Sequence, residues 1–294
     1  MADKFSIFEP LLPQPPWTNP WRPDGTYEPD LDTLVALVQV VAGSAQNTGM
    51  VAAAADMWAA HELRRAGFNA DEVWPRSRQP RVLTGELAAL LGPGGLPRAL
   101  AAEVERRLGG LPRVAPSEAR VLGGVYTKQA DVLVASWPRG LELLISTKTM
   151  LSSYAKNLRN RFEEAYGDAK NLRARFPMAA LGFLFLVGAD IPPGDFVFAC
   201  DMLRKLRTET DVYDVASLMV IATSPPGPVT VDLGRVPEDL QVGRFLGELC
   251  LRVTQRTPID HHVQVRERRE QTELPVEEGQ LDAEETSQPG PSPT

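Results

Sequence analysis

Two short apolar runs, Gln129-Ala-Asp-Val-Leu-Val-Ala135 and Glu142-Leu-Leu-Ile-Ser-Thr-Lys148, decide the fold class of this 294-residue chain. The segment between them, Ser136-Trp-Pro-Arg-Gly-Leu141, contains Pro-Arg-Gly, which is typical of a turn. Apolar and β-branched runs of this length, bounded by turn residues, are typical of buried strands. The sequence therefore predicts a β-hairpin over residues 129–148.

Three polar side chains are expected to meet at one end of this hairpin. If the turn is centred between Pro138 and Arg139, cross-strand pairing places Asp131 opposite Ser146. Lys148 then projects from the same face as Ser146, because alternate residues of a strand share a face. A charge among Val, Leu and Ile is costly unless it is paired. The pattern is compatible with a structural Asp131–Lys148 ion pair, with a solvated strand end, and with a catalytic site.

The elements around the hairpin predict an α/β fold. Helical periodicity is found in residues 31–41, 50–66, 86–91, 96–108, 152–176, 196–207 and 238–255. Strand-like runs are found in residues 121–135, 141–148, 179–187 and 218–223. This order predicts a central mixed β-sheet flanked by helices, preceded by an N-terminal helical region.

Composition divides the chain into four segments. Residues 1–30 hold seven prolines together with Trp17, Trp21 and Tyr27, which predicts an extended arm that lies on the domain by its aromatic rings. Residues 31–115 are mainly helical, and residues 116–258 form the α/β core. Residues 259–294 are polar and acidic without a hydrophobic period, so they are predicted to be a disordered tail.

The hairpin resembles the active site of a known nuclease superfamily. Asp131 and Ser146-x-Lys148, on adjoining strands that precede a long helix, are similar to the catalytic hairpin of the PD-(D/E)xK restriction-endonuclease-like nucleases. The resemblance covers about residues 118–223 and includes the order of strands and helices. It implies a restriction-endonuclease-like core and a Mg²⁺-dependent DNA endonuclease. In that family Asp131 would hold the metal ion, Lys148 would orient or help deprotonate the attacking water, and Ser146 would support the metal or water shell.

One position departs from the family pattern. Ser146 stands where these nucleases usually have a second acid, and the loss of a carboxylate weakens a Mg²⁺ site. Some restriction enzymes with Ser-x-Lys recruit the missing carboxylate from the following helix. The resemblance therefore implies Glu163 as catalytic residue and second metal ligand, with Glu164 as the alternative. Both glutamates also fit a role in solvating that helix.

Three further side chains are candidates for the same site. These nucleases often present a glutamate from an upstream helix, for which Glu62 and Glu118 are available. Gln129 shares the face of Asp131 and could support the water or metal shell by hydrogen bonding. Each of the three also fits an ordinary exposed position.

The charge distribution bears on a nucleic-acid partner. The net charge of −7 argues against a polyanion, but residues 270–294 hold seven acids and no Lys or Arg, so residues 1–269 are neutral overall. Residues 148–175 carry a local charge of +4, which favours contact with a phosphate backbone, although a solvated helix face would look the same. The expected DNA-binding residues there are Lys156, Arg159, Arg161, Lys170 and Arg173. A second basic patch comprises Arg76, Arg78 and Arg81.

These observations favour a type II restriction enzyme that cleaves double-stranded DNA with Mg²⁺ as a homodimer or higher homo-oligomer, because duplex cleavage needs two sites. The alternative is a nuclease-fold protein that has lost catalysis and serves as a DNA-binding or assembly module, as Ser146 suggests. A helix-rich interaction protein with a structural ion pair is a third possibility. Two cysteines outside any metal-binding motif, no secretion signal and no membrane-length apolar run predict a cytoplasmic protein without a membrane partner.

Overall fold

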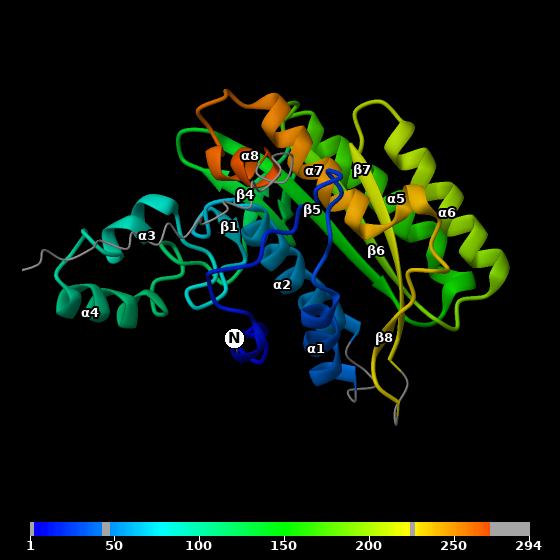
Figure 1. Cartoon of the computed structure of the whole chain (residues 1–294), viewed down its shortest axis with the longest axis horizontal. Coiled ribbons are helices and arrows are strands. Elements are labelled where there is room, and N and C mark those ends of the chain that lie inside the picture. The colour runs from blue at the N-terminus through cyan, green and yellow to red at the C-terminus, as the bar shows by residue number, and fades with distance from the viewer. Residues whose placement is uncertain (1–2, 43–47, 224–226, 271–294) are drawn as a thin grey trace, which may run out of the picture.

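The computed structural model describes residues 3–42, 48–223 and 227–270, and it shows an α/β protein built on a six-stranded mixed sheet (Figure 1). The predicted fold class is confirmed at this level. The helices are α1 (Leu31–Ala42), α2 (Thr48–Ala66), α3 (Gly85–Leu91), α4 (Arg98–Leu108), α5 (Tyr154–Arg173), α6 (Pro193–Thr208), α7 (Val242–Arg256) and α8 (Val263–Glu270), with 3-10 turns η1 (Glu9–Leu11) and η2 (Glu238–Leu240). The strands are β1 (Val73–Trp74), β2 (Arg120–Leu122), β3 (Thr127–Gln129), β4 (Val132–Ser136), β5 (Gly140–Met150), β6 (Ala180–Gly188), β7 (Val215–Ala222) and β8 (Thr230–Val231).

The large sheet has the strand order β1-β4-β5-β6-β7-β8, while β2 and β3 form a separate hairpin. Strands β5, β6 and β7 run parallel, and β1, β4 and β8 are attached to them by antiparallel pairing. In the predicted hairpin Val132 pairs with Ile145, as the turn position predicts, and a bulge after Val134 shifts the pairs closer to the turn. Asp131 therefore lies just before β4, next to Ser146.

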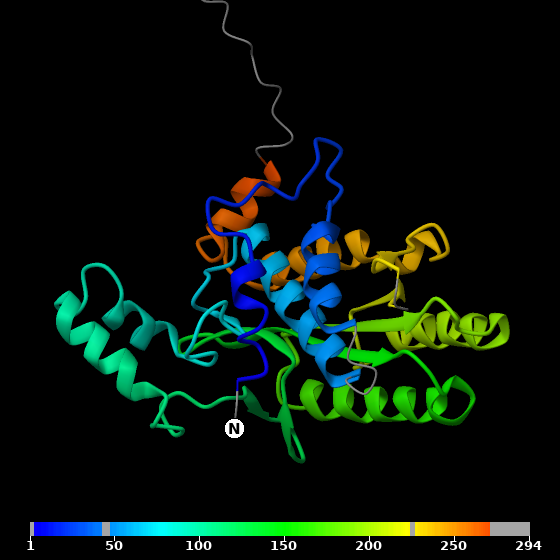
Figure 2. The same ribbon diagram turned by 90° about the horizontal axis from the view of Figure 1, so that it is seen from below.

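Helices cover both faces of the sheet (Figure 2). One core joins α1, α2 and α7 to one face, where Val132 and Ile145 are fully buried. The other core joins α5 and α6 to the opposite face through Leu133, Leu144 and a cluster of aromatic rings. Strand alternation explains this division, because successive side chains point to opposite faces. Within the three described ranges, no helix combines the length and apolar character needed to cross a membrane.

Two smaller parts extend this arrangement. Helices α3 and α4 project from the β1 side of the molecule and share a small core of their own (Figures 1 and 2). The N-terminal arm lies along the domain as expected, since Trp21 and Tyr27 are buried and their rings meet edge to face with centroids 5.2 Å apart. Strand β1, from the region predicted to be helical, pairs with β4 and so belongs to the sheet.

The prediction of disorder beyond residue 258 is wrong for the described part of that segment. Residues 263–270 form α8 because Val265 is buried against the core and His262 Nε2 lies 3.0 Å from Glu142 Oε1. A helix this short is not stable by itself, and these tertiary contacts stabilise it. Residues 271–294 of the predicted tail lie outside the described residues.

Candidate active site at the end of the hairpin

Asp131 is held at the open end of the β4–β5 hairpin by the backbone. Its Oδ2 accepts a hydrogen bond of 3.0 Å from the backbone N–H of Thr147. Burial raises the pKa of Asp131 and outweighs the lowering effects of the Thr147 N–H and of the Lys148 ammonium. Asp131 is thus a mostly desolvated carboxylate close to the lysine of the motif.

A second carboxylate, Asp56, comes from α2 and was not identified in the sequence. Its side chain is 4% exposed, and α2 packs directly on β4 and β5. Burial raises the pKa of Asp56 well above its ordinary value, and the nearby charge of Asp131 raises it further. A buried acid whose pKa is raised by burial and by a neighbouring acid is typical of a functional site.

Thr147 and Lys148 complete the surroundings of this acid pair, by which we mean Asp56 and Asp131. Since Ile145 faces α2, alternation also turns Thr147 toward α2, and its hydroxyl lowers the pKa of Asp56. Within the described ranges, Asp56 Oδ1 and Thr147 Oγ1 are buried without a hydrogen-bond partner of normal geometry. The charge of Lys148 lowers the pKa of both acids, and strand alternation sets its side chain on the α5 face of β5 with Ser146.

Ser146 faces the α5 side of the sheet and is 1% exposed. Its hydroxyl lies near that of Tyr213, whose pKa is raised mainly by burial and further by Asp168 and Asp131. Asp168 is the buried acid of α5, and it binds Lys128 and Tyr126 of the β2–β3 hairpin. The acid that α5 directs toward this end of the hairpin is therefore Asp168 rather than the predicted glutamates.

Glu163 and Glu164 are not brought to Asp131. Both are exposed on α5, on the face of the sheet opposite α2. Glu163 lines a hollow of about 700 Å³ between α5 and α6, and Glu164 forms an ion pair of 2.9 Å with Arg161. The expectation that Glu163 is a metal ligand beside Asp131 is corrected accordingly, because its helical position turns it to solvent.

Glu118 and Gln129 do lie beside the acid pair. They line a small cavity of about 20 Å³ together with Asp56 and Asp131. A space of this size holds about one water molecule. Glu118 also forms an ion pair of 3.3 Å with Arg120 at the surface.

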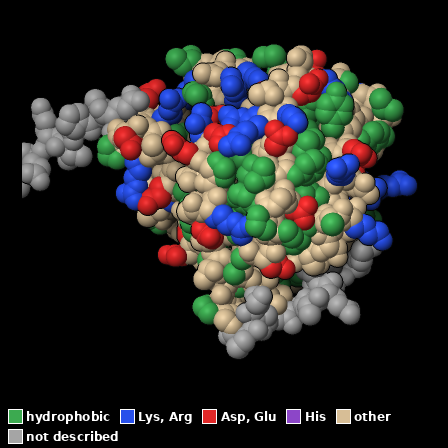
Figure 3. Space-filling view, turned by 90° about the vertical axis from the view of Figure 1, so that its right-hand side faces the viewer, with side chains coloured by type: hydrophobic (Ala, Val, Ile, Leu, Met, Phe, Trp, Pro, Cys, Tyr) green, Lys and Arg blue, Asp and Glu red, His purple; other side chains and the backbone are tan. Residues whose placement is uncertain are grey.

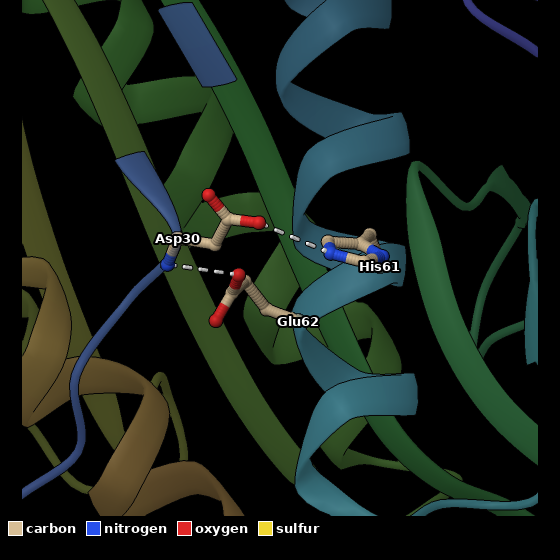
Figure 4. Close-up of side chains that lie close together, drawn as sticks. All are labelled: Asp30, His61 and Glu62. Carbon is tan, nitrogen blue, oxygen red and sulfur yellow. Dashed lines mark hydrogen bonds and ion pairs between the residues drawn. The ribbon is translucent and has the colours of Figure 1, made fainter. Parts of the chain in front are cut away.

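Glu62 belongs to a separate buried cluster that fastens the N-terminal arm to α2 (Figure 4). Its carboxylate accepts hydrogen bonds from the Asp30 N–H, from the Tyr27 hydroxyl and from Arg65. His61 Nε2 lies 3.5 Å from Asp30 Oδ2 in the same cluster. Asp30, His61 and Glu62 could together hold a metal ion by spacing alone, but the guanidinium of Arg65 already neutralises Glu62. We assign Glu62 a structural role, which corrects its placement at the hairpin.

The five predicted DNA-binding residues differ in their surroundings. Arg173 is 9% exposed and its guanidinium binds Asp214 and the backbone oxygens of Ala179 and Val212, so it is a structural residue and not a surface contact. Lys170 donates to Thr210 O, and Arg161 pairs with Glu164. Lys156 and Arg159 are exposed, the latter over the Phe198 ring. Figure 3 views the molecule from the α6 side, where Lys and Arg lie among apolar side chains.

The donors at the acid pair match the preferences of a hard divalent cation. Asp56, Asp131 and Thr147 offer only oxygen atoms, and one carboxylate oxygen and the hydroxyl are buried without a hydrogen-bond partner of normal geometry in the described structure. Mg²⁺ prefers carboxylate oxygens and keeps several waters. A buried polar atom without a partner is costly, and a bound cation with its waters would remove that cost. The residues present therefore fit Mg²⁺.

No protein-family model, curated protein or solved structure matches the chain.

Proposed function

We propose that the protein is a Mg²⁺-dependent endonuclease that hydrolyses phosphodiester bonds in double-stranded DNA. The observation that carries the proposal is the buried carboxylate of Asp56, which lies beside Asp131 with one oxygen lacking a normal hydrogen bond. The charge of Asp131 raises the pKa of Asp56, and two neighbouring carboxylates of this kind repel each other unless a proton or a cation lies with them. The neighbouring Lys148 is the third element of the hairpin motif.

The order of the elements supports a restriction-endonuclease-like core. Helix α2 precedes the β4–β5 hairpin, α5 follows it, and β6 then pairs parallel to β5. In this proposal the missing acid of the Ser-x-Lys motif is replaced from α2, by Asp56, and not from the following helix. With Asp56 in the place of the motif's second acid, the site has two carboxylates although Ser146 contributes none.

Each residue of the site has its own role in the proposed phosphodiester hydrolysis. Bound Mg²⁺ would polarise the scissile phosphate and make a coordinated water more acidic. Asp56 and Asp131 would hold the ion, and the Thr147 N–H keeps the Asp131 carboxylate in place. Lys148 positions the attacking water and stabilises the negative charge that grows on the phosphate. Ser146 is buried on the α5 side of the sheet, where its hydroxyl lies near Tyr213, and in this proposal it is not a metal ligand.

The type II restriction activity, the homo-oligomer and the cytoplasmic location remain parts of the proposal. Cleavage of both strands needs two acid pairs, hence at least two copies of the chain. Cys200 and Cys250 are both buried and unpaired, as expected for reduced thiols.

Plasmid cleavage tests the proposal. The purified protein with Mg²⁺ should convert supercoiled plasmid DNA to discrete linear fragments, and EDTA should stop the reaction. Asp131→Asn should remove cleavage, while Glu163→Gln, a matched change of a carboxylate to an amide, should leave it unchanged. A wild-type protein that leaves varied plasmids intact and binds no Mg²⁺ contradicts the proposal.

A catalytically inactive DNA-binding or assembly module is the second candidate. It is favoured by Ser146, which stands where the motif has an acid. Wild-type protein that binds duplex DNA at low salt and shows no metal-dependent cleavage selects this candidate.

A further inference from the structure

The N-terminal segment, residues 3–12, lies beside the acid pair, because its Lys4 and Phe5 line the same cavity. Phe5, Phe8 and Leu12 of this segment are buried in the core that includes α2. Lys4, next to Phe5, lines the same cavity as Asp56 and Asp131 and lowers the pKa of both. The segment thus brings a cation of its own to the two carboxylates.

Arg81 lines the same cavity, and its guanidinium is fixed from two sides. On one side, Nη1 donates to the backbone oxygens of Arg76 and Ser77, at 3.3 and 2.7 Å. On the other side, Nε donates to Asp3 Oδ2 and Nη2 to Glu9 Oε2, both at 2.8 Å. The first set of bonds does not involve the N-terminal segment, so it orients Arg81 whether or not that segment is in place.

The edge of Arg81 that meets Asp3 and Glu9 is the edge that binds a phosphate. Nε and Nη2 point in parallel, and their spacing matches two oxygens of one phosphate group. Here two separate carboxylates supply those two oxygens. The side chain of Arg81 is only 3% exposed with these partners in place.

We propose that Arg81 binds a substrate phosphate beside the acid pair and that Asp3 and Glu9 occupy its phosphate-binding edge until the substrate displaces them. This inference rests on the proposed function, since it names a substrate contact of the same site. The N-terminal segment then mimics the substrate complex, with carboxylates in place of phosphate oxygens and Lys4 beside the acids.

A hollow of about 380 Å³ continues outward from this point. Its lining includes Asp3, Lys4, Arg81, Ser117 and Glu118. Four of these residues, all but Asp3, also line the cavity at the acid pair. The substrate strand would enter along this hollow between the N-terminal segment and the segment before β2, and pass Arg81 before it reaches the acids.

Binding of inorganic phosphate and of a short DNA duplex to the full-length chain without divalent metal tests the proposal. Asp3→Asn with Glu9→Gln frees Arg81 and keeps the buried Phe5 and Phe8 anchors, so affinity for both probes should rise about tenfold. A charge-matched control, Asp201→Asn on α6 with Glu209→Gln at its C-terminal end, should change affinity less than twofold. Adding Arg81→Gln to the first pair should abolish the gain, and a thermal melt identifies any variant that has not folded.

The outcomes separate this inference from the proposed function. Equal affinities of the wild type and the Asp3/Glu9 variant overturn the inference, even if the wild type cleaves DNA with Mg²⁺. An equal gain in the α6 control also overturns it, because net charge alone would then explain the effect. A gain confined to the Asp3/Glu9 variant supports the inference, and if no form of the protein cleaves DNA, only the nuclease proposal fails.

Discussion

Asp131 and Thr147 are joined across the hairpin by a hydrogen bond of 3.0 Å from the Thr147 N–H to Asp131 Oδ2. The backbone of β5 therefore orients one acid of the pair, while the Thr147 side chain lies by the other acid, Asp56. Because these two contacts come from different parts of one residue, a substitution at position 147 can remove the second and keep the first.

Thr147→Val should weaken Mg²⁺ binding. Valine preserves the shape and the backbone N–H but removes the hydroxyl that lowers the pKa of Asp56. The loss of one hydrogen-bonding group beside a charged ligand predicts about tenfold weaker affinity. Isothermal titration calorimetry measures this, and Thr147→Ser should restore affinity. Identical affinities for the valine variant and the wild type would show that the hydroxyl has no part in the site.

Lys148→Ala should lower the rate of cleavage at saturating DNA by about a hundredfold, because the ammonium stabilises charge that develops in the transition state. Lys148→Arg keeps the positive charge but changes the shape of the side chain. Its cleavage rate should lie between those of the wild type and the alanine variant. Single-turnover kinetics distinguish this effect from weaker DNA binding. An alanine variant with an unchanged rate and a weaker DNA affinity would instead make Lys148 a binding residue.

Glu62→Ala should destabilise the fold without removing cleavage. The substitution leaves the buried Arg65 without its partner, at a cost of about 3 kcal/mol in the free energy of unfolding. Urea unfolding measures the loss, and plasmid cleavage at low temperature measures the activity that remains. Loss of cleavage in a Glu62→Ala variant shown to be folded would instead indicate that Glu62 belongs to the active site.

Asp214 should make stability depend on pH in the acid range. Burial alone raises the pKa of Asp214, but hydrogen bonds from Arg256 and Arg173 outweigh it and hold the pKa below its ordinary value. A carboxyl with a lowered folded-state pKa stabilises the protein fully above its unfolded pKa, and this stabilisation is lost as pH falls through the folded pKa.

Asp214→Asn should therefore cost about 3 kcal/mol near neutral pH, and the difference from the wild type should shrink on acidification. Urea unfolding across this range measures both quantities. Asp201→Asn, which breaks an exposed pair with Lys205, should cost less than about 1 kcal/mol at either end. A difference at Asp214 that is constant with pH would refute the linkage.

The hairpin was predictable because it is local. A turn with Pro-Arg-Gly between two continuous apolar runs sets the pairing of Val132 with Ile145 without reference to the rest of the chain. The bulge after Val134 left no signal in the sequence, since it accommodates a single residue near the turn.

The second acid could not be found by spacing from Lys148, because Asp56 comes from a helix that precedes the hairpin by more than sixty residues. A signal was nevertheless present. Asp56 is a single acid within the apolar run Val51–Trp58, and a charge on a helix face that must be buried needs a function or a partner. The resemblance to the nucleases implied a glutamate from an upstream helix, for which Glu62 and Glu118 were available, and so it did not point to Asp56. In the structure Glu62 forms an ion pair with Arg65.

Plasmid cleavage by the Asp56→Asn variant tests the central claim most directly, since Asp56 is the acid that completes the site. In the presence of Mg²⁺ the wild type should cleave supercoiled plasmid, and Asp56→Asn should slow cleavage by more than about a hundredfold while it keeps the wild-type thermal stability or exceeds it. Cleavage by Asp56→Asn at the wild-type rate would contradict the account.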